Sequence, residues 1–284
     1  MTRSLDSNSD DVQIELFASS AHLETRDDVW NLPLRGWVYR AESDSKKRRL
    51  AIGALRHSLG LEDEDETDCF KRRAGMFLAR NIDGIRVPIS RSGATHMCAP
   101  TGSDGHFEDQ IRIPARDLTV DDHYRNTFLE PEGLSVISDI DDTVKITHVR
   151  SKKELLLNTF VRPFRAVEGA RAEYQELASR GASFHYVSSS PWQLYGDLRS
   201  FLLREGFRVD EIHLRKFRLK DSSFVDFFRS SERFKPRVIR SILDRFPSRT
   251  FILIGDSGEN DKAIYESIAA DRPHQIEDII IRDV

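Results

Sequence analysis

Acidic, hydroxyl and basic side chains follow several short apolar runs in the second half of this 284-residue sequence. The runs LSVISDI, ASFHYVS and TFILIGD each lead into polar residues. In chain order these polar residues are Asp139, Asp141, Asp142 and Thr143, then Ser188, Ser189 and Ser190, and then Asp256 and Asp261. Lys235 stands at the start of the helix that is expected before the run TFILIGD. This set offers carboxylates, hydroxyl donors and a cation. Phosphoryl transfer through an aspartyl-phosphate requires these groups, so the sequence predicts that chemistry.

The spacing within D-x-D-x-T determines which of these side chains share a pocket. On extended backbone, residues 139 and 141 point to the same side, while Ile140 points toward the core. Two carboxylates would then crowd one pocket with a third from another strand end, and they would repel each other strongly without a cation. Ligation by oxygen alone favours magnesium, so we expect Mg²⁺ as the cofactor. Asp142 is predicted to accept hydrogen bonds in the turn.

Five compact apolar runs alternate with four segments of helical period after Glu132. Such alternation is typical of βαβ units around a parallel sheet, and it predicts an α/β fold with a doubly wound parallel sheet. Two of the helices carry clear apolar faces, one after Pro191 and one after Pro236. Because ligands bind outside the carboxyl ends of such strands, the polar residues are expected to converge there.

The first half of the chain has a different pattern of apolar residues. Residues 1–11 are polar and predicted to form a flexible tail. Residues 12–130 contain short, partly alternating runs (VQIELFA, LPLRGWVYR, GMFLARN, IRVPIS and HFEDQIRIP), which predict a smaller β-rich accessory domain, arranged as a sandwich or a similar fold. A helix is expected from Lys47 to Leu61, followed by an acidic loop. Residues 131–284 are expected to form the catalytic domain, a phosphatase domain if the predicted chemistry holds.

Composition excludes several classes of function. The net charge of −4 and pI of about 6.2 provide no overall field for nucleic acid, so no nucleic-acid partner is expected. The sequence start lacks the apolar region of a secretory signal, and no apolar run is long enough to span a bilayer, which favours a cytoplasmic location. Cys69 and Cys98 lie in no C-x-x-C or Cys/His array, so neither a disulfide framework nor a zinc site is predicted.

The ordered motifs resemble those of the haloacid dehalogenase superfamily of phosphatases over residues 133–284. The resemblance implies that Asp139 is the nucleophile and a magnesium ligand, and that Asp141 handles protons and also belongs to the metal site. It further implies that Ser188 binds phosphoryl oxygens, Lys235 neutralises them and Asp256 completes the metal shell. Asp261 would hold a metal-bound water or Lys235. Asp at position 141 favours phosphate ester chemistry over dehalogenation.

SDIDDTVKITHV, FHYVSSSPWQLY and FILIGDSGENDKAIY resemble, more closely, the phosphatidate phosphatase family typified by the fungal actin-patch protein, whose chemistry is similar to that of the lipins. This resemblance implies hydrolysis of phosphatidate to diacylglycerol and phosphate, with peripheral contact at a membrane. The runs RGWVYR and DGHFEDQIRIP fit the same family more loosely. The serine triplet departs from the pattern at Ser189, where the family is expected to have Asn, which puts one phosphate or substrate contact in doubt.

Several residues have both a functional and a structural interpretation. Ser189, Trp192, Lys216 and Arg218 are candidates for substrate binding. Trp192 could equally pack in the core, and the basic and aromatic run 215–228 could grip anionic lipid headgroups or form a solvated strand edge. The basic run 46–49 could touch acidic lipid or be compensated by the acidic run nearby. His148 is interpreted as a loop residue.

The segment 144–181 exceeds an ordinary crossover between two strands. It contains a short helix candidate, KKELLLN, before the main helix that is expected from Glu168. The superfamily places its cap here, and so small a cap predicts an open site that suits a bulky or membrane-borne substrate.

Three other functions compete with a lipid phosphatase. One is a soluble phosphomonoesterase acting on a metabolite or a phosphoprotein. Another is a membrane-associated scaffold with an idle phosphatase domain, which the complete set of polar residues disfavours. A response regulator also has an acidic pocket, but its phospho-acceptor follows the third strand, whereas Asp139 follows the first strand of its domain.

Overall fold

The computed structural model describes residues 3–4, 12–41, 46–61, 68–91, 94–117, 126–216 and 233–284. The chain divides into two compact units. Unit 1 comprises Met1–Asp44, Leu78–Pro131 and Asp210–Ile212, and unit 2 comprises Ser45–Phe77, Glu132–Val209 and His213–Val284. This division differs from a single boundary near residue 131, because residues 45–77 pack with the C-terminal part of the chain.

Unit 1 is built around the long strand β4 (Val29–Arg40). Antiparallel to it run β2 (Val12–Leu16), β3 (Ser19–Glu24), β5 (Arg80–Asn81) and β9 (His106–Pro114), and β10 (Asn126–Leu129) pairs in parallel with β3. Two small pairs accompany this sheet. They join β1 (Arg3–Ser4) with β6 (Ile85–Arg86), and β7 (Pro88–Arg91) with β8 (Ala94–Met97). A short 3-10 helix, η2, covers Ala115–Asp117.

The alternation of side chains along β4 explains the core of unit 1. Trp30, Leu32 and Leu34 are buried at every second position, and they pack with residues that include Phe107. Gly36 lies where the strands approach closely, since a Cβ there would stand 2.7 Å from the Phe107 ring. The apolar runs of the sequence therefore give β2, β4, β6 with β7, and β9, in agreement with the predicted strands.

The run GMFLARN was predicted as a strand, and that prediction is wrong for its first half. The helix α2 (Asp68–Met76) ends inside this run, and only Arg80–Asn81 is extended. The buried residues of this segment recur at helical spacing, which explains why the segment forms a helix rather than a strand. They are Phe70, Arg73, Ala74 and Phe77. The predicted helix from Lys47 is confirmed as α1 (Lys46–Ser58), whereas the acidic run 62–67 lies outside the described residues.

Unit 2 is mixed α/β and contains a five-stranded sheet in the order β13-β12-β11-β14-β15. Its strands are β11 (Gly133–Ser138), β12 (Ser183–Pro191), β13 (Glu211–Arg215), β14 (Arg249–Asp256) and β15 (Ile276–Arg282). The pairs β11 with β12, β11 with β14, and β14 with β15 are all parallel. All five apolar runs predicted as strands after Glu132 are confirmed.

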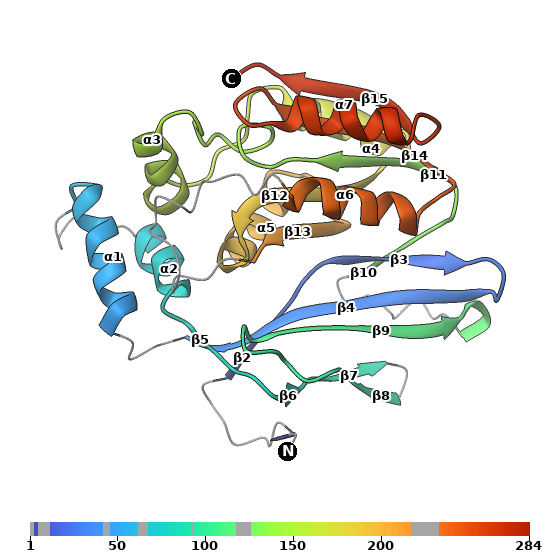
Figure 1. The fold of residues 1–284 in the computed structure, drawn as a ribbon, viewed down its shortest axis with the longest axis horizontal. Helices are drawn as coiled ribbons and strands as arrows, with labels where there is room; N and C mark the ends of the chain where they lie inside the picture. Colours follow the sequence, from blue (N-terminus) through green and yellow to red (C-terminus); the bar gives the residue numbers. More distant parts are fainter. Residues whose placement is uncertain are drawn as a thin grey trace. The chain divides into compact units, whose positions relative to one another are not determined.

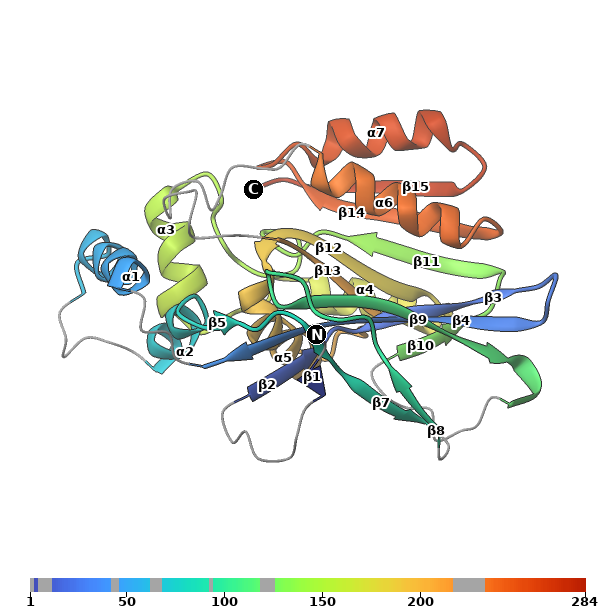
Figure 2. The ribbon, with the colours of Figure 1, turned by 60° about the horizontal axis from the view of Figure 1, so that its bottom comes forward.

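The helices of unit 2 connect these strands. They are α3 (Lys152–Leu156), which continues into the π-helical turn η3 (Leu157–Val161), α4 (Ala170–Ser179), the 3-10 turn η4 (Trp192–Leu194), α5 (Tyr195–Arg204), α6 (Phe234–Arg245) and α7 (Asp261–Asp271). Figure 1 shows α6 and α7 in front of the sheet, with α4 and α5 behind it, and Figure 2 gives the same arrangement from another direction.

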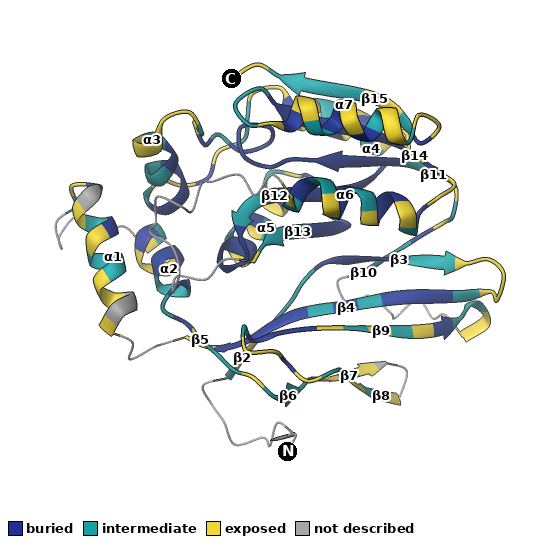
Figure 3. Ribbon diagram, in the orientation of Figure 1, coloured by how far each residue is buried: buried dark blue, intermediate teal, exposed yellow. Residues whose placement is uncertain are grey.

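Successive residues of the central strands are buried on both faces of the sheet. Val136 and Ile137 of β11, and Phe251 to Ile254 of β14, are almost completely inaccessible, as the dark strands of Figure 3 show. A strand covered on both faces needs apolar residues at every position, which explains the continuous apolar runs of the sequence. In the described part of the chain, no helix combines the length and apolarity needed to cross a membrane.

Candidate active site

The polar residues that follow β11, β12 and β14 meet at one edge of the sheet in unit 2. Asp139 follows β11, and its backbone N–H donates to the Ile254 carbonyl of β14 at 2.9 Å. Asp256 is the last residue of β14, and Ser188 lies near the end of β12. Parallel pairing of β11 with both neighbours brings these three positions together, as the sequence predicted.

Three carboxylates form a buried group at this edge. Ligand oxygens of Asp139, Asp256 and Asp261 all lie within 4.8 Å of one another, and all three residues are buried. Asp256 Oδ1 is oriented by the backbone N–H groups of Gly258, at 2.6 Å, and Glu259, at 3.0 Å. Asp261 is the first residue of α7, where the helix N-terminus stabilises its negative charge.

Two oxygens of this group fit a cation. Asp256 Oδ2 and Asp261 Oδ2 are buried and have no hydrogen-bond partner in the described structure. Buried carboxylate oxygens are normally satisfied, so two such atoms beside each other indicate a missing partner. Gly255 leaves room for Asp261, since a Cβ there would stand 2.6 Å from Asp261 Oδ2. An oxygen-only group of this kind suits Mg²⁺.

Lys235, in the first turn of α6, is the cation among these acids. Its Nζ lies 2.9 Å from Asp139 Oδ1, 2.6 Å from Asp261 Oδ1 and 2.7 Å from Glu259 Oε2. Burial alone would lower the pKa of Lys235, but the surrounding carboxylates raise it well above its usual value. The ammonium group therefore stays charged inside the protein.

One ammonium group does not balance the acids around it. Asp139, Asp256, Asp261 and Glu259 supply four carboxylates against Lys235. Burial, followed by repulsion from its acidic neighbours, raises the pKa of Asp139 well above the usual range despite Lys235. Burial and the Asp261 carboxylate likewise raise the pKa of Asp256 to about 7. An additional positive charge beside these carboxylates would favour the ionised forms of Asp139 and Asp256.

Asp141 belongs to a second, separate polar network. Its Oδ2 accepts from the hydroxyls of Ser188 and Ser190, at 2.9 and 2.8 Å. Its Oδ1 accepts from Thr147 Oγ1 and lies beside Lys145 Nζ, each at 2.8 Å. Burial acts to raise the pKa of Asp141, but Lys145 and these donors outweigh it and lower the pKa to about 2.

This network changes the expected composition of the metal site. The predicted metal group was Asp139, Asp141 and Asp256, whereas the carboxylates that cluster are those of Asp139, Asp256 and Asp261. Asp141 has its oxygens occupied by hydroxyls and an ammonium group instead. Ser188, predicted to bind phosphoryl oxygens, donates to Asp141 in this arrangement.

Asp142 and Thr143 support the site from within the motif. Asp142 accepts from the backbone N–H groups of Thr147, His148 and Val149 at 2.6 to 2.7 Å, which confirms its predicted role as a turn acceptor. Both Asp142 and His148 have positive φ, as the tight loop demands. The Thr143 hydroxyl lies 3.4 Å from Asp139 Oδ2 and donates to it. His148 is an exposed loop residue, as expected.

Sequence reasoning missed Lys145, Ser190 and Glu259 as members of the site. The sequence indicates Ser190 only as a member of the serine triplet, and it predicts no role for Glu259 in the loop after β14. Lys145 follows Asp141 by four residues, and its side chain is buried. The sequence gives no sign of this burial. An isolated bridge between Asp141 and Lys145 bends the chain so that the two side chains meet.

The described residues that were proposed to bind substrate differ in their surroundings. Trp192 is buried at the start of η4, which favours its packing interpretation. Ser189 is half-buried, and its carbonyl accepts from Arg215 Nε at 3.1 Å. Lys216 is exposed, and Arg218 lies outside the described residues with most of the basic and aromatic run. Burial lowers the pKa of Arg215, and Glu259 partly offsets this effect.

A parallel sheet with buried carboxylates, a lysine and a serine at its carboxyl edge defines an α/β protein with a buried cluster of acidic side chains at that edge. Comparison with known sequences places it more narrowly. The family described as phosphatidate phosphatase APP1, catalytic domain, matches residues 134–283, and the chain belongs to this family. The matched segment contains Asp139, Ser188, Lys235 and Asp256.

Two yeast proteins are similar to part of the chain. An uncharacterized protein of Schizosaccharomyces pombe is 35% identical over 161 residues, and the phosphatidate phosphatase APP1 of Saccharomyces cerevisiae is 34% identical over 159 residues. Each match covers 55% of this chain. The matches span only 26% and 27% of the respective relatives, so the chain corresponds to about a quarter of their length.

Proposed function

We propose that this protein is a magnesium-dependent phosphatase that hydrolyses phosphatidate to diacylglycerol and phosphate through an aspartyl-phosphate on Asp139. The observation that carries the proposal is the contact of Lys235 with Asp139 beside two unsatisfied carboxylate oxygens. The family and the name of the yeast relative support the lipid substrate. The strand order and the helices on both faces of the sheet support a doubly wound, haloacid dehalogenase-type catalytic domain.

Asp139, Asp256 and Asp261 would hold the magnesium ion. When bound, Mg²⁺ would neutralise phosphoryl oxygens and favour the ionised form of the carboxylates. Lys235 would add a second positive charge beside Asp139, close to the oxygens that become more negative during transfer. Glu259 and Asp261 would keep the lysine aligned through their hydrogen bonds.

The first half-reaction forms the covalent intermediate. A carboxylate oxygen of Asp139 attacks phosphorus, the bond from phosphorus to the lipid oxygen breaks, and that oxygen takes a proton from Asp141. Ser188 and Ser190 hold Asp141 ionised in the described arrangement. When phosphoryl oxygens accept hydrogen bonds from these two hydroxyls, Asp141 would lose two donors. The pKa of Asp141 would then rise, so that Asp141 could carry the proton.

The second half-reaction removes the phosphate. Asp141, now a carboxylate, takes a proton from water, and the water oxygen attacks phosphorus. The bond between phosphorus and Asp139 breaks, which regenerates the nucleophile and releases phosphate. Lys145, 2.8 Å from Asp141, would then favour release of that proton from Asp141 to solvent as phosphate leaves.

Phosphate release from phosphatidate in mixed micelles, compared with a panel of small soluble esters, tests the proposal. Each assay is run with magnesium and with a chelator, for the native chain, Asp139→Asn and the exposed control Asp278→Asn. We expect hydrolysis of phosphatidate that requires magnesium and falls by about three orders of magnitude or more in Asp139→Asn alone. Equal activity of Asp139→Asn and the native chain would refute the nucleophile.

The same assay separates the alternatives. Rapid hydrolysis of soluble esters without activity on phosphatidate would identify a soluble phosphomonoesterase. Absence of hydrolysis on every substrate, with retained binding to acidic vesicles, would indicate a scaffold. Peripheral membrane contact, a cytoplasmic location and the absence of a nucleic-acid partner stay predictions from the sequence.

A further inference from the structure

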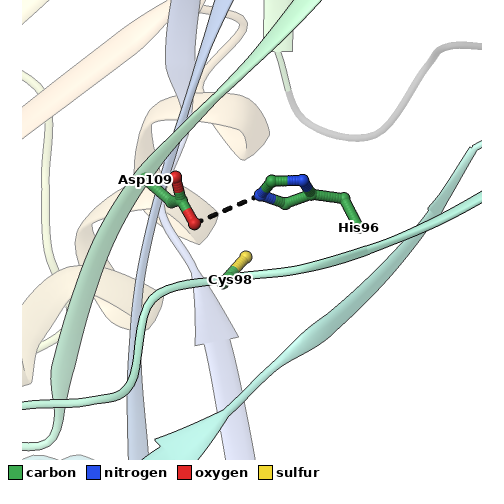
Figure 4. Close-up of side chains that lie close together, drawn as sticks. All are labelled: His96, Cys98 and Asp109. Atoms are coloured by element: carbon green, nitrogen blue, oxygen red, sulfur yellow. Dashed lines mark hydrogen bonds and ion pairs between the residues drawn. The ribbon is translucent and has the colours of Figure 1, made fainter.

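A histidine, a cysteine and an aspartate meet in unit 1. His96 lies on β8, Cys98 follows that strand, and Asp109 lies on β9. Figure 4 shows the imidazole, the thiol and the carboxylate directed toward one another. One ligand atom from each residue lies within 4.8 Å of the other two, so one small ion could contact all three.

The distances agree with those in a compact metal site. His96 Nε2 lies 3.1 Å from Asp109 Oδ2. Typical zinc bonds to nitrogen, oxygen and sulfur are about 2.0 to 2.3 Å, so ligand atoms around a tetrahedral ion stand about 3.3 to 3.7 Å apart. The His96 and Asp109 donors lie close to this spacing, and the Cys98 sulfur lies within 4.8 Å of both.

The carboxylate is held in place by the backbone. Asp109 Oδ2 accepts from the N–H of Ala99 and Asp109 Oδ1 accepts from the N–H of Gln110, each at 2.7 Å. These bonds favour the ionised carboxylate and fix its orientation beside Cys98. Preorganised ligands of this kind lose little entropy when a metal binds.

We propose that His96, Cys98 and Asp109 form a zinc-binding site, with water or an external ligand at a fourth position. Thiolate and imidazole ligands favour Zn²⁺ over the hard cation expected at the acidic site of unit 2. Burial, and then the Asp109 carboxylate, raise the pKa of Cys98 to about 11, so the metal-free protein carries a thiol. Zinc binding forms the bond to sulfur and releases the thiol proton to solvent.

Zinc at this position would join two parts of unit 1. The hairpin of β7 and β8 is a separate two-stranded sheet, whereas β9 pairs with β4 in the six-stranded sheet. His96 and Cys98 come from the hairpin side, and Asp109 comes from the larger sheet. A bound ion would therefore link the two sheets and stabilise unit 1 against unfolding.

Metal titration of the full chain tests the site. Protein freed of metal by a chelator is titrated with Zn²⁺, and separately with Co²⁺, in saturating Mg²⁺ so that the acidic carboxylates are occupied. The bound metal is counted by elemental analysis, and the Co²⁺ form is examined for the charge-transfer absorption of a cobalt–thiolate bond. We expect one zinc per chain, a thiolate band that zinc displaces, and a higher melting temperature with zinc.

Variants assign the ligands. Cys98→Ser should abolish the cobalt–thiolate band, and His96→Gln, whose side chain is 37% exposed, should weaken zinc binding by about a hundredfold or more without unfolding the protein. Cys69→Ser is the matched control and should leave both readouts unchanged. Absence of a thiolate band, loss of the band in Cys69→Ser, or unchanged affinity in His96→Gln would each overturn the proposal. These readouts do not depend on phosphate release.

Discussion

Lys235 Nζ lies 2.9 Å from Asp139 Oδ1 and 2.6 Å from Asp261 Oδ1, so one buried ammonium group connects the nucleophile candidate to a second buried carboxylate. Lys235→Met would leave these carboxylates without their cation. We expect activity to fall at least about a hundredfold and unfolding free energy to fall by about 3 kcal/mol or more at neutral pH. Phosphatase assays and urea unfolding measure both effects, and the exposed Lys262→Met is the control. An active Lys235→Met would exclude a catalytic role for the lysine.

The pKa of Asp256, raised to about 7, predicts how stability depends on pH and magnesium. Its folded pKa exceeds the unfolded value, so the folded state binds more protons between about pH 4 and 7, and stability falls as pH rises through that window. Magnesium should oppose this loss. We expect the rise in melting temperature on adding Mg²⁺ to be larger at about pH 8 than at about pH 5. A rise that is equal at both pH values would contradict a metal site at Asp256.

The pKa of Asp141 predicts the opposite dependence. Burial acts to raise this pKa, but Lys145 and the hydroxyls of Ser190 and Thr147 outweigh burial and lower the pKa to about 2. A lowered pKa stabilises the fold above about pH 4, and that contribution is lost as pH falls toward about 2. Lys145→Met should cost on the order of 3 kcal/mol at neutral pH, and the difference from the native chain should shrink in acid. Its activity profile should shift to higher pH because the pKa of Asp141 rises.

Urea unfolding across the acid range and a pH profile of phosphate release measure these effects of Lys145→Met. Lys153→Met, at an exposed position on α3, is the matched control. A merely structural lysine would change stability and leave the pH profile where it was, so an unshifted profile would refute the positioning role.

The contacts of Arg73 predict that unit 2 needs residues 45–77 for its stability. Its guanidinium donates to the carbonyls of Thr159 and Arg162 at 2.9 and 2.8 Å, and it lies 3.5 Å from the centre of the Phe164 ring. We expect Arg73→Met to lower the unfolding free energy by about 2–4 kcal/mol, because the buried Thr159 carbonyl and the partly buried Arg162 carbonyl lose their donor. The half-exposed neighbour Arg72, paired with Asp197, should cost less than about 1 kcal/mol when changed to Met.

Thermal unfolding of both arginine variants, measured alongside a chain that starts at residue 132, checks this prediction. The shortened chain lacks Phe70, Ala74 and Phe77, which are buried in the described structure. We expect it to be less stable than the full chain. If the shortened chain unfolds at the same temperature as unit 2 does in the full chain, α1 and α2 are dispensable.

The amino-acid sequence by itself determined the strands of unit 2 and the residues at their ends. Continuous apolar runs specify strands buried on both faces, and parallel pairing brings their carboxyl ends to one edge, so Asp139, Ser188 and Asp256 could be placed near each other. The buried faces of α5 and α6 followed from helical spacing in the same way.

Only the tertiary structure decided which polar groups touch. The bend from Asp141 to Lys145 brings an ammonium group to one carboxylate, and the start of α7 brings Asp261, in place of Asp141, close to Asp139 and Asp256. In unit 1, the β7–β8 hairpin and the larger sheet place His96 and Cys98 beside Asp109. The spacing of these residues in the sequence does not predict this proximity. Sequence patterns record burial and period along the chain, whereas these contacts depend on loop geometry and on segments distant in sequence, which only the packed fold fixes.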